Sequence, residues 1–274
     1  MSTASMELFL ELFTLPFMQR ALIAGIATAV PLAMLGVFVT AKGIAFFGDG
    51  IAHASLAGIA LGLLIGVSPL WCALAVAVVF ALALALLEEK SRLKSDTTLA
   101  LLFTVGFAVA IVLLSMDQGF QPDIMSYLFG NILTISSADL LFIVPFAGVC
   151  ALILLALQRR MMLLVLNREM AWLAGIPVAA THALLYTLLA ITVVVAVKLL
   201  GVVLVSALLV IPVVAARQWA RSLQSLFAWS VVFAELAVIG GLIASYMLDL
   251  PSGATIVLTG ALLAGIAFVL RLRP

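Results

Sequence analysis

Two residues in this sequence combine the types and the spacing that metal-ion chemistry needs. Asp49 and His53 stand in an otherwise apolar run, FFGDGIAHASLAGIALG, at residues 46–62. Residues four apart share one face of a helix, with their Cβ atoms about 5–6 Å from each other. A carboxylate oxygen and an imidazole nitrogen are both common ligands of Zn²⁺, Mn²⁺ and Fe²⁺. The pair therefore predicts a cation site with two ligands on one helix.

Such a site suits an ion in transit, because a closed cage of ligands would not release its ion. Two ligands, doubled by a second copy of the chain or completed by water, would replace enough of the hydration shell. The same residues also have ordinary explanations. Asp49 could cap the start of its helix, and His53 could be a hydrogen-bonded core histidine. The residues alone favour neither view.

The amino-acid composition indicates whether these side chains lie in water or in a membrane. The chain has 274 residues, of which 66% are hydrophobic and 9% charged, whereas soluble domains contain about 25% charged residues. This indicates a polytopic membrane protein. A net charge of +1 and the lack of a basic run exclude a nucleic-acid partner. No GxxxxGK[ST], HExxH or GxSxG motif is present, so neither ATP hydrolysis nor a familiar hydrolase reaction is predicted.

The hydrophobic pattern predicts an all-α transmembrane bundle of eight or nine spans within a single domain, residues 1–274. A span needs about 20 apolar residues. The nine candidates are residues 21–41, 49–67, 71–87, 97–114, 139–157, 179–197, 201–215, 226–247 and 254–270. Residues 201–215 are too few for a full crossing and predict a half-helix that Pro212 helps to break. Residues 1–20 are expected at the membrane interface, and residues 124–137 as a re-entrant or interfacial segment.

Basic residues predict the orientation, because cytoplasmic loops are enriched in Lys and Arg. With residues 88–95 in the cytoplasm, alternation places 42–48, 158–178, 217–225 and the C-terminus on the same side. These segments hold 11 of the 13 basic residues, all but Arg20 and Lys198. Nine spans then put the N-terminus outside and the C-terminus in the cytoplasm.

Small residues follow the same span as the polar pair. Gly58, Gly62 and Gly66 stand four apart, a spacing that lets another helix approach closely. Their row lies about 100° around the helix from the row of Asp49 and His53. The helix is therefore expected to pack tightly on one side and to present the polar pair on the neighbouring side, as a helix beside a pore would.

Residues 158–178 form the most polar cytoplasmic segment. Asn167 is placed to cap a short helix that starts at Arg168 and ends at Gly175, with Pro177 beyond it. Such a helix would serve either as a docking site for a soluble partner or as a simple connector.

Three other charged or titratable positions lie in or next to spans. Glu235 lies in the middle of VVFAELAVIGG and is expected to hydrogen-bond a neighbouring helix. Lys198 and His182 stand at span ends, where interfacial positions explain them. Proton coupling through Asp49, His53 or Glu235 is the competing interpretation, that of a secondary transporter.

Five segments together resemble the permease subunit of metal-ion ABC importers, most closely the zinc-uptake permease. In order they are FFGDGIAHASLAGIALG, PDIMSYLFGNIL, NREMAWLAGI, GVVLVSALLVIPVVAAR and DLPSGATIVL, and the resemblance covers residues 20–270. It implies two permease copies in the bacterial inner membrane, a pair of cytoplasmic ATPases and an extracytoplasmic metal-binding protein. No permanently bound cofactor is implied, since the metal ion is the cargo.

The resemblance also assigns residues. Asp49 and His53 match the pair that meets the metal along the pathway. Residues 167–177 resemble the loop that contacts the ATPase, which implicates Asn167, Glu169, Ala171, Leu173, Gly175 and Ile176. One departure concerns the metal: zinc permeases carry a histidine a few residues beyond an Asp-Thr pair, and here Asp96-Thr97 is followed by none. Zinc is the expected cargo, with manganese or iron as the alternatives.

Overall fold

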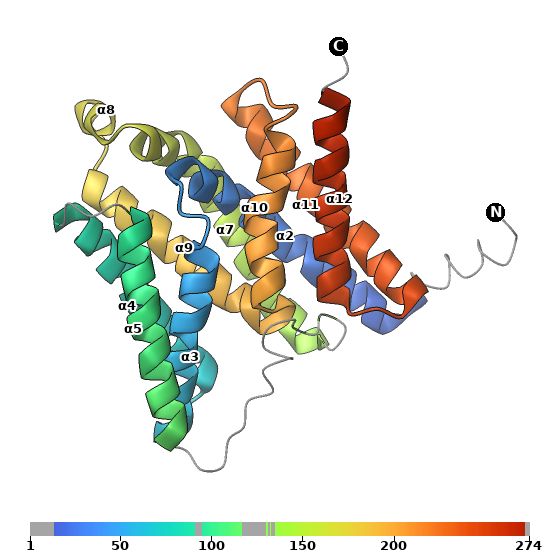
Figure 1. The fold of residues 1–274 in the computed structure, drawn as a ribbon, viewed down its shortest axis with the longest axis horizontal. Coiled ribbons are helices and arrows are strands. Elements are labelled where there is room, and N and C mark those ends of the chain that lie inside the picture. Colours follow the sequence, from blue (N-terminus) through green and yellow to red (C-terminus); the bar gives the residue numbers. More distant parts are fainter. Residues whose placement is uncertain (1–13, 91–94, 117–129, 131, 133–134, 272–274) are drawn as a thin grey trace, which may run out of the picture.

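The computed structural model describes residues 14–90, 95–116, 130, 132 and 135–271, and this part of the chain folds as a bundle of ten helices (Figure 1). The helices are α2 (Pro16–Lys42), α3 (Phe47–Ile65), α4 (Pro69–Lys90), α5 (Ser95–Met116), α7 (Ser137–Leu166), α8 (Arg168–Leu173), α9 (Val178–Leu200), α10 (Val202–Ala216), α11 (Leu223–Leu248) and α12 (Ser252–Arg271). No strand occurs within the described ranges. The all-α prediction is confirmed.

Eight of these helices are long and apolar enough to cross a membrane. The ninth candidate, α10, has 15 residues and is therefore only about 22 Å long, short of a hydrocarbon core of about 30 Å. The predicted short helix is thus present. Pro212, however, lies inside α10, and the helix continues to Ala216. The expectation that Pro212 breaks this segment is wrong at that position.

Two predicted boundaries are also corrected. α7 runs on to Leu166, so residues 158–166 are helix rather than loop. Arg159 and Arg160 are good helix formers, and neither glycine nor proline interrupts the stretch. At the other terminus, α2 begins at Pro16 and takes up residues that were predicted to be interfacial. Residues 1–13 and most of 124–137, for which interfacial or re-entrant structure was predicted, lie outside the described residues.

The short helix α10 stands among longer neighbours. It packs against α2, α11 and α12, and also contacts α3 and α9. α3, α4 and α5 form a second group, in which α3 packs on both other helices, while α9 connects the groups through its contacts with α4, α7 and α10. The two groups lie on either side of α9 in Figure 1.

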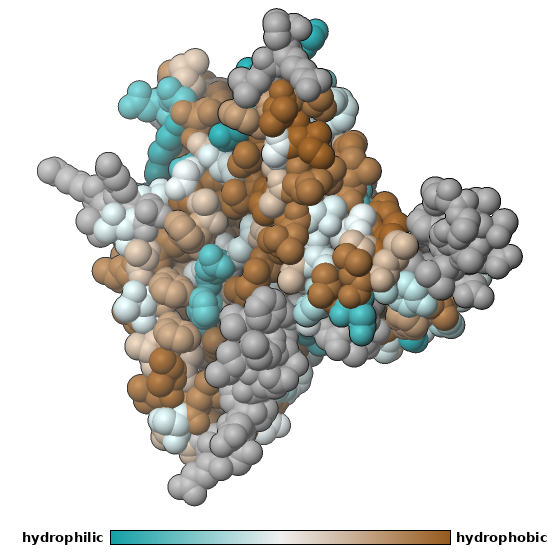
Figure 2. All heavy atoms as spheres, turned by 45° about the vertical axis from the view of Figure 1, so that its right-hand side comes forward, coloured by the Kyte–Doolittle hydropathy of each residue, from teal (hydrophilic) through white to brown (hydrophobic). Residues whose placement is uncertain are grey.

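The outer surface of the bundle is apolar, as lipid contact requires. Leu141 on α7 and Leu258 on α12 are 80% and 67% exposed. Apolar side chains cover most of the face drawn in Figure 2, with polar ones in small groups between them. Only 11% of the apolar 18-residue stretch of α5 is buried inside the protein. This is the smallest buried share among the eight spans.

Glycines allow α3 and α4 to approach each other, as the small-residue row predicted. A Cβ at Gly58 would lie 2.6 Å from the Cα of Ala73 and from the carbonyl oxygen of Cys72. Gly62 similarly faces the backbone of Pro69. Gly66 does not share this role, because it ends α3 in the left-handed conformation (φ 71°) with open space around it.

The segments that the basic residues assign to the cytoplasm lie together. Figure 1 shows α8, the turn after α2, residues 217–222 and the last turn of α12 towards one end of the bundle, which we call the α8 end. α3 begins below this end, inside the bundle (Figure 1). The alternation of loops predicted from the sequence therefore matches the course of the chain.

Candidate functional site

Asp49 lies in the first turn of α3, and a hydroxyl from another helix fixes its carboxylate. Helix α3 starts at Phe47, with Phe46 at the N-cap position and no side chain capping it. The explanation of Asp49 as the cap is therefore wrong. Its Oδ1 accepts a hydrogen bond of 2.6 Å from Ser206 Oγ of α10. Because an ionised carboxylate has further lone pairs, this contact leaves Oδ2 available.

The glycines on either side of Asp49 explain how two helices approach it. A Cβ at Gly48 would lie 2.9 Å from Leu209 Cδ1 and 3.1 Å from Ser206 Oγ. A Cβ at Gly50 would lie 3.0 Å from Leu99 Cδ1 of α5. The Gly-Asp-Gly sequence thus admits α10 on one side of α3 and α5 on the other, with the carboxylate between them.

His53 lies one turn further along α3, between two aromatic rings of α5. Its ring centroid is 5.1 Å from that of Phe103 and 5.0 Å from that of Phe107, with an interplanar angle of 77° to each. Its Nδ1 is buried and has no hydrogen-bond partner in the described part of the chain. The expectation of a satisfied core histidine is therefore not met, and the edge-on rings hold the imidazole in place without bonding it.

Both residues line one cavity of about 380 Å³ between α3 and α5. Its walls are Phe46, Gly50, Leu99, Ala100 and Phe103, and it is otherwise apolar. Among the described residues, no group of three or more His, Cys, Asp or Glu side chains could hold a metal ion. From its described residues, one chain therefore offers a cation one carboxylate and one imidazole here, with room for water or for ligands from elsewhere.

Helix α8 has the start that the sequence predicted. Asn167 occupies the N-cap, and its side chain accepts a hydrogen bond of 3.0 Å from the backbone N–H of Met170. The helix ends at Leu173, two residues earlier than expected, and Gly175 then adopts a left-handed conformation (φ 73°). The Ile176 N–H donates to the Ala171 carbonyl and closes the turn.

The side chains of α8 divide into one buried contact and an exposed face. Ala171 is fully buried against the bundle, whereas Trp172 and Leu173 are 71% and 70% exposed. Glu169 is also exposed. A short helix with two large apolar side chains uncovered, at the end of a membrane bundle, has the composition of a contact surface for a partner.

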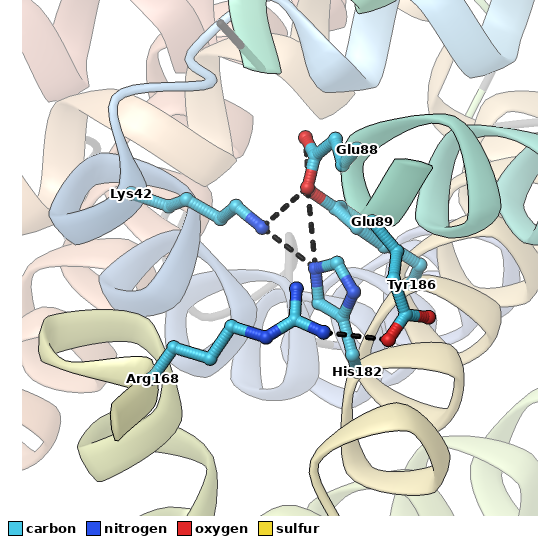
Figure 3. A network of polar contacts seen from close by, with 6 residues as sticks. All are labelled: Lys42, Glu88, Glu89, Arg168, His182 and Tyr186. Carbon is cyan, nitrogen blue, oxygen red and sulfur yellow. Dashed lines mark hydrogen bonds and ion pairs between the residues drawn. The ribbon is translucent and has the colours of Figure 1, made fainter. Parts of the chain in front are cut away.

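A polar network next to α8 was not found from the sequence (Figure 3). Lys42 Nζ lies 2.7 Å from Glu88 Oε2 and 2.7 Å from His182 Nε2, and the hydroxyl of Tyr186 donates to Glu88 Oε1 at 2.8 Å. His182 is only 8% exposed, so it is buried within the protein near the start of α9. Arg168 of α8 pairs with Glu89 at 2.6 Å. Because its residues come from four separate helices, no local sequence pattern could predict this cluster.

Glu235 differs from its prediction, whereas Lys198, in the last turn of α9, gains an ion-pair partner. Both carboxylate oxygens of Glu235 are buried without a hydrogen-bond partner among the described residues, so the expected bond to a neighbouring helix is not seen. Lys198 forms an ion pair of 3.3 Å with Asp139 at the start of α7. This contact joins α9 to α7 at the end opposite α8.

An apolar bundle with a two-ligand polar pair beside a cavity has the architecture of a membrane transport subunit, and nothing in its motifs supplies a catalytic reaction. The chain belongs to the ABC 3 transport family, whose model matches residues 14–271. The predicted family is confirmed, and the proton-coupled secondary transporter is set aside.

Two curated relatives and one solved structure define the relationship. The chain is 34% identical over 260 residues to the manganese transport system membrane protein MntC of Halalkalibacterium halodurans, covering 95% of this chain and 89% of that protein. It is 31% identical over 256 residues to the high-affinity zinc uptake system membrane protein ZnuB of Haemophilus influenzae, covering 92% and 95%. A chain of PsaBC from Streptococcus pneumoniae in complex with Fab matches with a TM-score of 0.82 and 28% identity, covering 96% and 95%.

This chain is therefore a multi-pass permease of a metal-ion ABC importer. It is a transport component and not an enzyme, and permeases of this family work with an ATPase and a substrate-binding protein. The relatives are named for different metals, manganese and zinc. Membership of the family therefore does not identify the transported metal, which has to be argued from the ligands of the site.

Proposed function

We propose that two copies of this chain form the translocation pathway of an importer for zinc, in which Asp49 and His53 hold the ion briefly. The observation that carries this proposal is the shared cavity of about 380 Å³, which the carboxylate and the imidazole both line. Ser206 fixes one carboxylate oxygen and two phenylalanines fix the imidazole ring. The ligands are thus held in position before an ion arrives.

The need for a second copy follows from the number of ligands. One chain supplies two, and the described residues contain no larger group of His, Cys, Asp and Glu. Two copies related by a twofold axis would supply two oxygens and two nitrogens. The poorly covered face of α5, next to the cavity, offers surface for that arrangement.

The choice of zinc follows from the same ligand set. Zn²⁺ in proteins is typically tetrahedral and accepts imidazole nitrogen and carboxylate oxygen. Two oxygens and two nitrogens match that geometry. Mn²⁺ favours sites with more oxygen ligands, so a manganese ion at this site would need additional water molecules as ligands. Manganese and iron are the alternative cargoes.

The orientation and the coupling complete the proposal. The α8 end carries the basic segments and would face the cytoplasm of a bacterial plasma membrane, together with the C-terminus. The exposed Trp172 and Leu173 of α8 would then contact the ATPase, with residues Asn167–Ile176 as the coupling loop. A metal-binding protein would deliver the ion at the opposite end. The ion is cargo, and no cofactor is permanently bound.

Zinc uptake by the complete transporter tests this proposal. The permease and its ATPase are reconstituted in liposomes with the binding protein, and uptake of Zn²⁺, Mn²⁺ and Fe²⁺ is measured in competition. Asp49→Asn and His53→Ala should each abolish uptake while the complex still assembles. Asp249→Asn is the matched control, because Asp249 is exposed and its left-handed backbone (φ 51°) suits asparagine. Full uptake by both site variants would overturn the metal site, and preferred uptake of manganese would overturn the choice of zinc.

A further inference from the structure

Helix α8 is connected to the bundle by a polar contact as well as by packing. Arg168, the first residue of α8, donates a hydrogen bond of 2.6 Å to Glu89 in the last turn of α4. Arg168 and Glu89 are both partly exposed, with side chains 48% and 38% accessible. Through this pair, a movement of α8 would act on the end of α4, in addition to α7 and α9, against which α8 packs.

The preceding residue of α4, Glu88, points into the bundle instead. Consecutive residues of a helix lie about 100° apart, and the Glu88 side chain is only 7% accessible. Its two oxygens accept from Lys42, the last residue of α2, and from Tyr186 of α9, as Figure 3 shows. His182 Nε2 lies 2.7 Å from Lys42 Nζ and 3.2 Å from Glu88 Oε2, so His182 of α9 belongs to the same cluster. Glu88 thus joins α4 to α2 and α9.

Tyr186 extends these contacts to the helix that carries the metal ligands. Its ring stacks on that of Phe47, with centroids 5.3 Å apart and planes at 11°. The ammonium group of Lys42 lies 4.7 Å from the centre of the same tyrosine ring. Phe47 is fully buried, is the first residue of α3, and stands two residues before Asp49. A shift of Tyr186 would consequently displace the start of α3.

From these contacts we infer that Glu88 and Tyr186 are positioning residues that couple α8 to the metal site. The path runs from Arg168 through the adjacent Glu89 and Glu88 to Tyr186, and from there to Phe47 and Asp49. The inference rests on the proposed role of α8 as the ATPase contact. A buried carboxylate with two charged or hydroxyl donors favours discrete arrangements over gradual ones, because a half-broken buried pair is costly. Such an element can switch between two states.

The first experiment separates coupling from stability. Tyr186→Phe keeps the ring on Phe47 and removes only the hydroxyl that donates to Glu88. In proteoliposomes containing the complete importer, the number of zinc ions imported per ATP hydrolysed should fall about fivefold or more. About fivefold is the lower end of the range by which one site typically affects another. ATPase binding should be retained. Tyr246→Phe is the matched control, since this tyrosine of α11 is 36% exposed, and its ratio should equal that of the wild type. An unchanged ratio in Tyr186→Phe would overturn the inference.

The contact between α8 and α4 is tested by exchange of charge. Arg168→Glu and Glu89→Arg should each lower the same ratio, and the double variant should restore it, because the pair is re-formed with opposite polarity. A merely structural role would lower the melting temperature and the yield of complex without changing ions imported per ATP. Equal ratios in both single variants and the wild type would remove α8 from the path.

The second readout does not depend on which ion is transported. Phe46→Cys places a thiol at the cavity, in a chain whose natural cysteines are replaced (Cys72→Ala and Cys150→Ala). Its rate of reaction with a water-soluble maleimide is compared with and without vanadate-trapped nucleotide on the ATPase. The rate should change when nucleotide is trapped, and Tyr186→Phe should abolish this change. If the rate responds equally in both chains, the inference is wrong. If the wild-type importer moves no metal while the labelling result holds, the proposed function fails and the coupling path stands.

Discussion

Removal of one hydroxyl should weaken metal binding without touching a ligand. Ser206→Ala deletes the donor that holds Asp49 Oδ1 at 2.6 Å. Without this hydrogen bond, the Asp49 side chain can occupy three staggered rotamers. Restricting it to one rotamer when the ion binds then costs about 0.7 kcal/mol. If two copies surround one ion, as proposed above, this doubles to about 1.4 kcal/mol, or about tenfold in affinity. Loss of outer-shell partners at metal sites typically costs about 10–100-fold, so tenfold is the conservative expectation.

The assay is a zinc titration of the complete importer in nanodiscs, in competition with a chromophoric chelator. The control is Ser230→Ala, because the Ser230 hydroxyl is also buried but donates to the Leu226 carbonyl of its own helix at 2.7 Å. Its affinity should match that of the wild type. The reasoning is refuted if Ser206→Ala binds zinc within twofold of the wild type while Asp49→Asn does not bind. That result would mean that the carboxylate needs no fixed orientation.

Three further predictions concern the elements around the site. Phe103→Leu removes one of the two rings beside His53 and should raise the half-saturating zinc concentration several-fold, measured as uptake, with little change in the maximal rate; an unchanged value would show that the ring does not orient the imidazole. Gly58→Ala brings a Cβ to within 2.6 Å of the backbone of α4 and should destabilise the bundle by about 1–3 kcal/mol, seen as a lower melting temperature. Gly148→Ala, at a position with open space, should not do so. Asn167→Ala removes the N-cap hydrogen bond of α8, worth about 1 kcal/mol, and should weaken ATPase binding in a pull-down; equal binding would exclude α8 as the contact.

The parts of the fold that local patterns specify were predictable. Apolar runs of span length identified the membrane helices, and the few residues between Gly201 and Arg217 identified the short one. Asn167 indicated the start of α8 because a side-chain cap is a contact within three residues. Helix ends without such a marker were misplaced. α7 extends past its apolar run because arginines continue a helix as readily as leucines do.

The site was only half predictable, for a physical reason. Asp49 and His53 lie one turn apart on one helix, so their spacing alone brings them to one face. Ser206 and Phe103 belong to helices far along the chain, and only tertiary packing brings them to the pair. For Ser206, the only local indication was its position as a single hydroxyl residue inside the apolar run VVLVSALLV. Two partners of Glu88, Lys42 and Tyr186, come from α2 and α9, and nothing near Glu88 in the sequence indicates them.

The shortness of α10 has a consequence for the lipid environment of the importer. A spanning helix that is too short normally makes the surrounding bilayer thin or makes the helix tilt. Longer helices surround α10, with α2, α11 and α12 packed against it, so protein instead of lipid makes up the missing length. Asp49 receives its hydrogen bond from this shielded helix. Zinc affinity should therefore stay constant between liposomes of short-chain and long-chain lipids, even where hydrophobic mismatch along the exposed α5 alters the rate of transport.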